Sequence, residues 1–186
     1  MLILKSKSPR RMEILKSLGF QFLVEPSLYP EEQLRGEAVF DYLKRVTLGK
    51  LEMKSNKPGN TYLSSDTIVV YNQQILQKPL GPEEAFQMLK LLSGNIHSVY
   101  SGLGIRTEED EIFYEYDKTD VYFKPWTNEE INYYVENYRP FDKAGAYGIQ
   151  DRESPVGKYE GSYMNVVGFP LRKFFLFIEK LSKYID

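Results

Sequence analysis

The chain has 186 residues, of which 42% are hydrophobic and 27% charged, and its formal net charge is −2. These are ordinary globular values, and the length is enough to bury a core within a single domain over 1–186. The slight negative charge counts against stable nucleic-acid binding, which needs a basic excess. The absence of cysteine excludes disulfides, zinc–thiolate sites and cysteine nucleophiles.

Membrane association is not indicated either. No stretch approaches the ~20 apolar residues of a transmembrane helix. The N-terminal apolar run, Leu2 to Leu4, is too short for a signal peptide. We therefore expect a cytoplasmic protein with no membrane partner.

The first third of the chain predicts two strands and two helices. Leu2–Leu4 indicates a short buried strand, and Ser8 and Pro9 are typical of a helix start, with Ser8 as the N-cap. Gly19 ends this helix, and a second strand is predicted from Phe20 to Val24. A helix is predicted over roughly 37–54, with these residues facing inward: Phe40, Leu43, Val46 and Leu51.

The middle of the chain carries the strongest strand signal, the run Thr-Ile-Val-Val-Tyr within 62–71. Asn72-Gln73 predicts a turn back toward Ile75-Leu76. Pro82 begins another helix, and Gly94 stands just past its end.

The last half predicts a long hairpin followed by helices. The alternating runs 96–107 and 111–124 form the hairpin, and Thr127 with Glu130 forms a capping box for a helix near 128–137. Glycine and short strands fill 143–168, and one closing helix is predicted over 170–184. This order indicates a mixed α/β fold with a largely antiparallel, twisted sheet and flanking helices, rather than a purely parallel sheet.

A candidate phosphate site follows the first strand, in Ser6-Lys7-Ser8-Pro9-Arg10-Arg11. The start of a helix presents unpaired backbone N–H groups and the positive end of its dipole. Hydroxyl groups and guanidiniums placed there can hold phosphate oxygens, and arginine does so through two parallel hydrogen bonds. On these residues alone, the alternative is a capped helix with two solvated arginines.

A candidate metal site lies at Asp66, within Ser64-Ser65-Asp66-Thr67 at the head of the most apolar strand. A carboxylate entering a buried strand is costly unless it is paired or bound to a metal. A hard divalent cation such as magnesium is a natural partner and accompanies triphosphate substrates. The alternative is a carboxylate at the strand edge that caps a neighbouring loop.

Other polar residues stand beside strand or helix ends, and each alone is typical of a solvated surface: Glu31, Glu32, Lys50 and Lys78. His97, the single histidine, lies in an alternating run and is predicted to be structural. The segment from Asp142 to Gln150 is rich in small residues, which lets a backbone approach a ligand closely, and the Gln150 amide can read a base edge.

Six segments occur in order between residue 4 and about residue 175: Ser6-Lys7-Ser8-Pro9-Arg10-Arg11, Asp66-Thr67-Ile68-Val69, Lys78-Pro79, Ser93-Gly94-x-x-His97-x-Val99, Asp142 through Gln150, and Gly161-Ser162-Tyr163-x-Asn165-Val166-Val167-Gly168-x-Pro170-Leu171. Together they resemble the Maf family of nucleoside triphosphate pyrophosphatases. The block from Lys143 to Gln150 resembles the branch that acts on dTTP and UTP.

The resemblance implies a role for each matching position. Asp66 matches the catalytic acid, and Lys50 and Lys78 match lysines of the cleft. Glu31 best matches the loop glutamate, with Glu32 one residue away as the alternative. Ser6 and Arg10 match phosphate-contacting residues, and Arg11, Thr67 and Gln150 match positions associated with substrate choice. Ser8 is predicted to bind substrate beside them.

The resemblance also implies a fold similar to the inosine-triphosphate pyrophosphatase superfamily, with two lobes around a cleft. One Mg²⁺ or Mn²⁺ held by Glu31 and Asp66 would assist attack of water on the alpha phosphorus, releasing pyrophosphate. A homodimer is a family-level expectation. Two other readings stay open: a modified or purine triphosphate as substrate, and a non-catalytic nucleotide-binding regulator of cell division.

The chain departs from the family pattern at a few positions, none of which removes a proposed catalytic group. They are Lys5 for a small residue, Gly49 for an acid, Ser65 for alanine, Asn95 for arginine and Asp151 for glycine.

Overall fold

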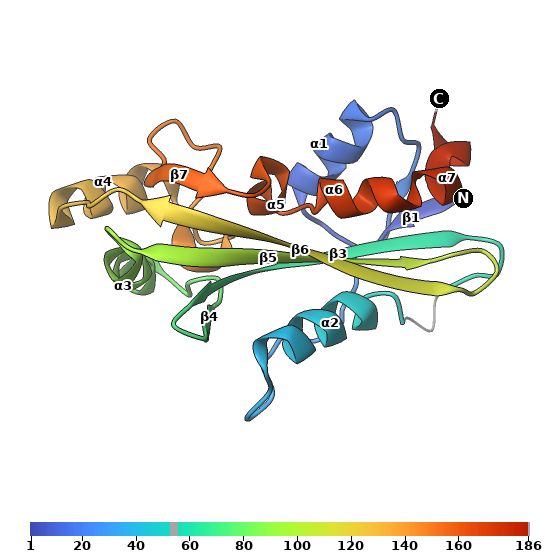
Figure 1. The fold of residues 1–186 in the computed structure, drawn as a ribbon, viewed down its shortest axis with the longest axis horizontal. Coiled ribbons are helices and arrows are strands. Elements are labelled where there is room, and N and C mark those ends of the chain that lie inside the picture. The colour runs from blue at the N-terminus through green and yellow to red at the C-terminus, as the bar shows by residue number, and fades with distance from the viewer. Residues whose placement is uncertain (53–55, 186) are drawn as a thin grey trace. The chain divides into compact units, whose positions relative to one another are not determined.

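The computed structural model describes residues 1–52 and 56–185, so the last two residues of the helix predicted over 37–54 lie outside the described residues. Within the described part of the chain, seven strands form one sheet in the order β2-β1-β3-β5-β6-β7, with β4 paired to β3 (Figure 1). The strands are β1 (Leu2–Leu4), β2 (Leu23–Val24), β3 (Thr61–Tyr71), β4 (Gln74–Leu76), β5 (Ile96–Arg106), β6 (Ile112–Phe123) and β7 (Val156–Glu160).

Helices and short 3₁₀ turns (η) alternate with these strands. They are α1 (Pro9–Ser17), α2 (Val39–Gly49), α3 (Pro82–Leu92), α4 (Asn128–Tyr138), η1 (Ala144–Ala146), α5 (Tyr163–Val167), α6 (Leu171–Phe174), η2 (Phe175–Phe177), α7 (Ile178–Leu181) and η3 (Ser182–Tyr184). None of the helices in the described ranges is long and apolar enough to cross a membrane.

The predicted mixed sheet is confirmed. β1 pairs in parallel with both β2 and β3, whereas β4 pairs antiparallel with β3 and β7 antiparallel with β6. The turn predicted at Asn72-Gln73 is also present, and both residues have positive φ (49° and 63°), as a tight hairpin turn requires. The capping box of Thr127 and Glu130 begins α4 as predicted.

Three local predictions were wrong. The second strand is only β2, because Phe20 makes just an isolated bridge with Ile185. Phe40 is 49% exposed and lies against the ring of Tyr116 instead of facing inward. The closing helix is broken into α6, η2, α7 and η3, with 3₁₀ turns between the short α-helical pieces.

The chain divides into two compact units. The first unit comprises 1–66, 101–117 and 168–186, and the second comprises 67–100 and 118–167. Within the first unit, α1, α6 and α7 cover one face of the strands and α2 covers the other (Figure 1).

The second unit has its own apolar core, formed mainly by α3, α4 and the strands beside them. The face of α3 predicted from its helical spacing is buried: Ala85, Met88, Leu89 and Leu92. The polar residues of the second unit are therefore carried by helices and strands that pack around a core of their own.

Candidate functional site

Three parallel strands direct polar residues to one edge of the sheet in the first unit. The register places Leu4, the last residue of β1, beside Val24 of β2 and Leu63 of β3. Since parallel strands run in the same direction, the segments that continue beyond these positions begin at a common edge. Ser6, the loop after β2 and Asp66 are therefore brought to the same side by strand pairing alone.

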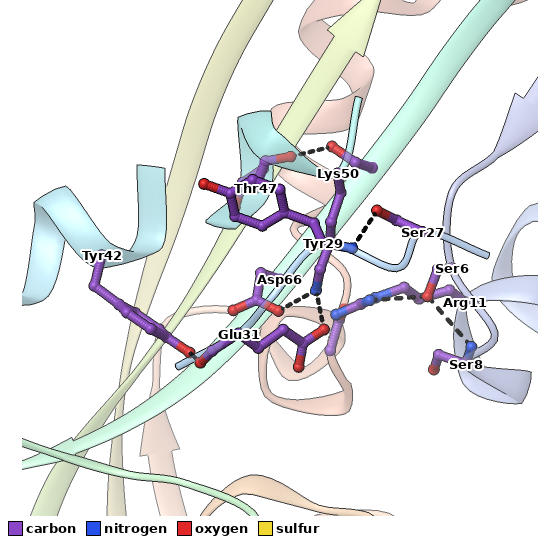
Figure 2. A network of polar contacts seen from close by, with 12 residues as sticks. Ser6, Ser8, Arg11, Ser27, Tyr29, Glu31, Tyr42, Thr47, Lys50 and Asp66 are labelled. Atoms are coloured by element: carbon purple, nitrogen blue, oxygen red, sulfur yellow. Dashed lines mark hydrogen bonds and ion pairs between the residues drawn. The ribbon is translucent and has the colours of Figure 1, made fainter. Parts of the chain in front are cut away.

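Lys50 lies between two carboxylates at this edge. Its Nζ is 2.6 Å from Oδ1 of Asp66 and 2.7 Å from Oε1 of Glu31 (Figure 2). Lys50 and Asp66 are only 6% and 7% exposed, so these ion pairs satisfy charges that would otherwise be costly to bury. Of the two candidate glutamates, Glu31 is the one whose carboxylate reaches Lys50.

The loop that carries Glu31 is attached to α2. The Tyr42 hydroxyl donates to the backbone carbonyl of Glu31 at 2.6 Å. Arg45 donates from Nε and Nη2 to the Glu37 carboxylate at 2.6 and 2.8 Å, and from Nη2 to the carbonyl of Glu32 at 2.9 Å. This hydrogen bonding lowers the pKa of Glu37 and raises that of Arg45. The fork geometry holds the loop in a defined position.

Gly49 is explained by the same loop. A Cβ atom at this position would overlap the ring of Tyr29, so only glycine lets the ring lie against the end of α2. Glycine in place of the usual acid before Lys50 is therefore part of how this chain packs its loop.

Arg11 joins this cluster from α1. Its Nη1 donates to Ser6 Oγ at 3.0 Å (Figure 2). Its Nε donates to the Gly168 carbonyl at 2.8 Å. Burial lowers the pKa of Arg11, the charge of Asp66 raises it, Arg10 lowers it and Glu31 raises it. Both acids are thus electrostatic neighbours of this guanidinium.

Ser8 occupies the N-cap position of α1, as predicted, but its side chain does not cap the helix. No hydrogen bond from a helix N–H to the Ser8 side chain is present; instead, the backbone N–H of Ser8 donates to Ser6 Oγ at 3.2 Å. Ser6 therefore organises the turn between β1 and the helix, and it accepts from Arg11 with the same oxygen.

Lys5, one of the departures from the family pattern, is buried and paired. Its Nζ lies 3.2 Å from Oε1 of Glu25 and 4.7 Å from the centre of the Tyr62 ring. A carboxylate and an aromatic face both stabilise an ammonium, which explains how a lysine fits where a small residue is usual.

Arg10 is half-buried in the first turn of α1, and the remaining predicted residues belong to the second unit. Thr67 is half-buried on β3, whereas Lys78 and Gln150 are exposed. The N–H of Gly145 donates to the carbonyl of Gln77 at 3.2 Å, which joins the segment before Lys78 to the block that ends at Gln150. Two segments far apart in sequence thus lie side by side within this unit.

His97 has the structural environment expected of it. Its Nε2 lies 2.8 Å from the Tyr147 hydroxyl, and its ring packs edge-on against Phe123 and Tyr147. Burial lowers the pKa of His97 to about 4, although Asp120 acts in the opposite direction. The imidazole is therefore neutral at ordinary pH.

The donor set of the first unit fits a divalent cation that also binds substrate. Glu31 and Asp66 supply two carboxylates, and among the described residues no group of three or more acidic or histidine side chains could form a complete cage. Magnesium commonly uses one or two protein carboxylates and completes its octahedron with water and phosphate oxygens.

The fold and this polar network define a mixed α/β protein with a charged site at the edge of three parallel strands. The fold is similar to that of the Ham1 protein of Staphylococcus aureus, with a TM-score of 0.51, 13% identity, and coverage of 96% of this chain and 99% of that one. This likeness concerns the fold alone.

The sequence comparisons identify the family. The model of the Maf-like proteins matches residues 1–181, and the chain belongs to the Maf family. The dTTP/UTP pyrophosphatase of Leptospira interrogans is 48% identical over 185 residues, covering 100% of this chain and 97% of the relative. The dTTP/UTP pyrophosphatase of Alkaliphilus oremlandii is 44% identical over 178 residues, covering 92% and 91%. The predicted resemblance is confirmed.

Proposed function

We propose that this protein hydrolyses nucleoside triphosphates, above all dTTP and UTP, to the monophosphate and pyrophosphate. The observation that carries the proposal is the convergence of Glu31, Lys50, Asp66 and Arg11 at one sheet edge. Acids beside buried cations are suited to binding a polyphosphate and activating water. The activity for which the two relatives above are named supports the same conclusion.

Asp66 carries the proposed catalytic carboxylate. In this proposal its carboxylate orients or deprotonates the water that attacks the alpha phosphorus, and Lys50 fixes the orientation of that carboxylate from 2.6 Å away. The first turn of α1 supplies backbone donors for phosphate oxygens. The proposed triphosphate-binding side chains are Ser6, Ser8, Arg10, Arg11, Lys50 and Lys78.

We propose Glu31 and Asp66 as the residues that hold Mg²⁺ or Mn²⁺. When bound, such a cation polarises phosphate oxygens and lowers the pKa of a coordinated water. The attachment of the loop to α2 through Tyr42 and Arg45 holds the backbone that carries the Glu31 carboxylate.

Thr67 and Gln150 are the proposed base-reading residues. A site that makes specific hydrogen bonds rejects a base that leaves them unmade, at a cost of about 1–3 kcal/mol for each buried group. A pyrimidine preference follows if these side chains match the edge of thymine and uracil.

The broader setting is proposed from the sequence. We expect 1–186 to act as one Maf-like domain, in the cytoplasm, as a homodimer. A modified or purine triphosphate is the nearer alternative substrate, and a non-catalytic regulator of cell division is the more distant alternative. Asp66, held by a buried lysine, favours an enzyme, because a binding protein needs no such acid beside phosphate.

The decisive experiment is pyrophosphate release from dTTP, UTP, CTP and methylated GTP, each with and without Mg²⁺ or Mn²⁺. We expect metal-dependent turnover that is fastest with dTTP and UTP. Equal rates for all four nucleotides would refute the pyrimidine preference, and turnover unaffected by a chelator would refute the proposed metal.

A further inference from the structure

We propose that Tyr134 and Asp151 are positioning residues that hold the segment 148–151 in one conformation and so set the nucleotide preference through Gln150. The inference rests on the proposed function and extends it to residues that do not themselves contact the nucleotide. It concerns the second unit alone.

Tyr134 connects both ends of this segment through one hydroxyl group. Its side chain is completely buried on α4. The hydroxyl donates to Oδ2 of Asp151 and accepts the backbone N–H of Gly148 at 3.0 Å. The N–H of Asp151 in turn donates to the carbonyl of Gly148 at 3.3 Å, which closes the turn. Gln150 therefore projects from a turn whose two ends share a single buried anchor.

The Asp151 carboxylate also packs directly against the start of the turn. A Cβ atom at Gly148 would lie 2.6 Å from Oδ2 of Asp151, which is closer than such atoms approach each other. Glycine at 148 and aspartate at 151 are thus fitted to one another, and the path of the backbone leading to Gln150 depends on both.

Residues on either side of the turn restrict it further. Tyr147 lies immediately before the turn, and its hydroxyl is 2.8 Å from Nε2 of His97. After the turn, the N–H of Glu153 donates to the hydroxyl of Tyr138 at 3.2 Å, and the ring of Tyr138 stacks on that of Tyr134 with centroids 4.7 Å apart. These contacts hold the two flanks, and the contacts of Tyr134 with Gly148 and Asp151 hold the residues between them.

The hydroxyl of Tyr134 is suited to this role because it stays protonated. Burial raises its pKa, and the hydrogen bond to Asp151 raises it further. A buried hydroxyl with both a donor and an acceptor partner is a directional anchor, and removal of either partner leaves a polar group unsatisfied.

The substitutions Tyr134→Phe and Asp151→Ala each remove one half of the anchor. We expect both to reduce the preference for dTTP over CTP about tenfold, mainly through KM, with kcat nearly unchanged, because base recognition and not phosphate chemistry is disturbed. Asp151→Asn retains an acceptor oxygen for the tyrosine and is expected to keep most of the preference. Tyr138→Phe, in the stacked neighbour whose hydroxyl binds outside the turn, is the matched control and should leave the preference intact.

A second measurement examines the turn directly. Amide hydrogen exchange at Gly148 and Asp151, whose N–H groups bond within the anchored turn, should accelerate at least tenfold in Tyr134→Phe and Asp151→Ala, but not in Tyr138→Phe. Thermal melting of each variant establishes that the protein is folded. If Tyr134→Phe does not fold, comparison of Asp151→Ala with Asp151→Asn decides the question.

The outcomes separate this inference from the proposed function. If the wild-type protein hydrolyses dTTP and UTP preferentially and the two anchor variants keep that preference, the inference is overturned and the proposed function stands. A wild-type protein without turnover overturns the proposed function, and with it the assigned preference, whatever the exchange rates show.

Discussion

The candidate groups of the first unit are held by ion pairs, whereas the segment that leads to Gln150 in the second unit is held by hydrogen bonds to buried tyrosine hydroxyl groups. In the first unit, Lys50 touches two carboxylates and Arg11 lies near both. In the second unit, Tyr134 and a neutral His97 hold the segment through hydroxyl contacts. Charges act over several ångströms, but hydrogen bonds require alignment. We therefore expect changes in the first unit to alter the rate for every nucleotide, and changes in the second to alter the choice among them.

The largest expected effect tests the first half of this contrast. Asp66→Asn should reduce kcat by roughly a thousandfold for all nucleotides, because an amide cannot serve as a base. The fold should survive, since the amide oxygen can still accept from Lys50. Steady-state kinetics measures the loss, and Asp110→Asn in an exposed turn is the control. A change in nucleotide preference without a fall in rate would break the contrast.

The buried His97 of the second unit should make the stability of the folded protein fall in acid. The pKa of His97 is about 4 in the folded protein and 6.5 ordinarily. Between these two pH values the imidazole is protonated in the unfolded chain but neutral in the folded protein. This contribution to stability is complete above pH 6.5, and about 2 kcal/mol of it is lost between pH 7 and pH 5. Urea unfolding at both pH values measures it.

The control for this prediction is His97→Gln, which keeps a hydrogen-bonding group near Tyr147 but does not titrate. Its stability should fall less between pH 7 and pH 5 than that of the wild type. If both proteins lose stability equally, the histidine is not the group responsible.

The smallest expected effect concerns the metal. Lys50→Met removes the ammonium that both carboxylates contact and so leaves less positive charge beside Glu31 and Asp66. Mn²⁺ alone should then bind about tenfold more tightly, because like charges at close range favour a cation between them. Isothermal titration of the metal-free protein measures this. Weaker binding would mean that these acids are not the metal ligands.

Much of the fold was predictable because its signals are local and long. The helix from Pro82 has a regular apolar face and a glycine just beyond its end, and the hairpin of β5 and β6 has extended alternation with an acidic turn. The prediction of one closing helix was wrong because the spacing of apolar residues does not reveal the 3₁₀ turns that interrupt it. The prediction that Phe40 faces inward was wrong because helical spacing does not show that its ring packs against Tyr116.

The candidate site was predictable in its members but not in its contacts. The motif identified Asp66 and Arg11, yet nothing in the spacing showed that Lys50 would lie between Asp66 and Glu31, because these residues meet only through strand register and a long loop. Tyr42 was missed for the same reason. No signal in a single sequence relates a helix to the loop that precedes it.

The register of β1, β2 and β3 restricts where the chain can change in length. Side chains of a strand alternate between faces, so one added or deleted residue between Leu63 and Asp66 would send the carboxylate to the opposite face of the sheet. The loop after β2 is under no such rule, and extra residues there are tolerated as long as Tyr42 and Arg45 still reach it. Insertions and deletions should therefore accumulate in that loop and be excluded from the first half of β3.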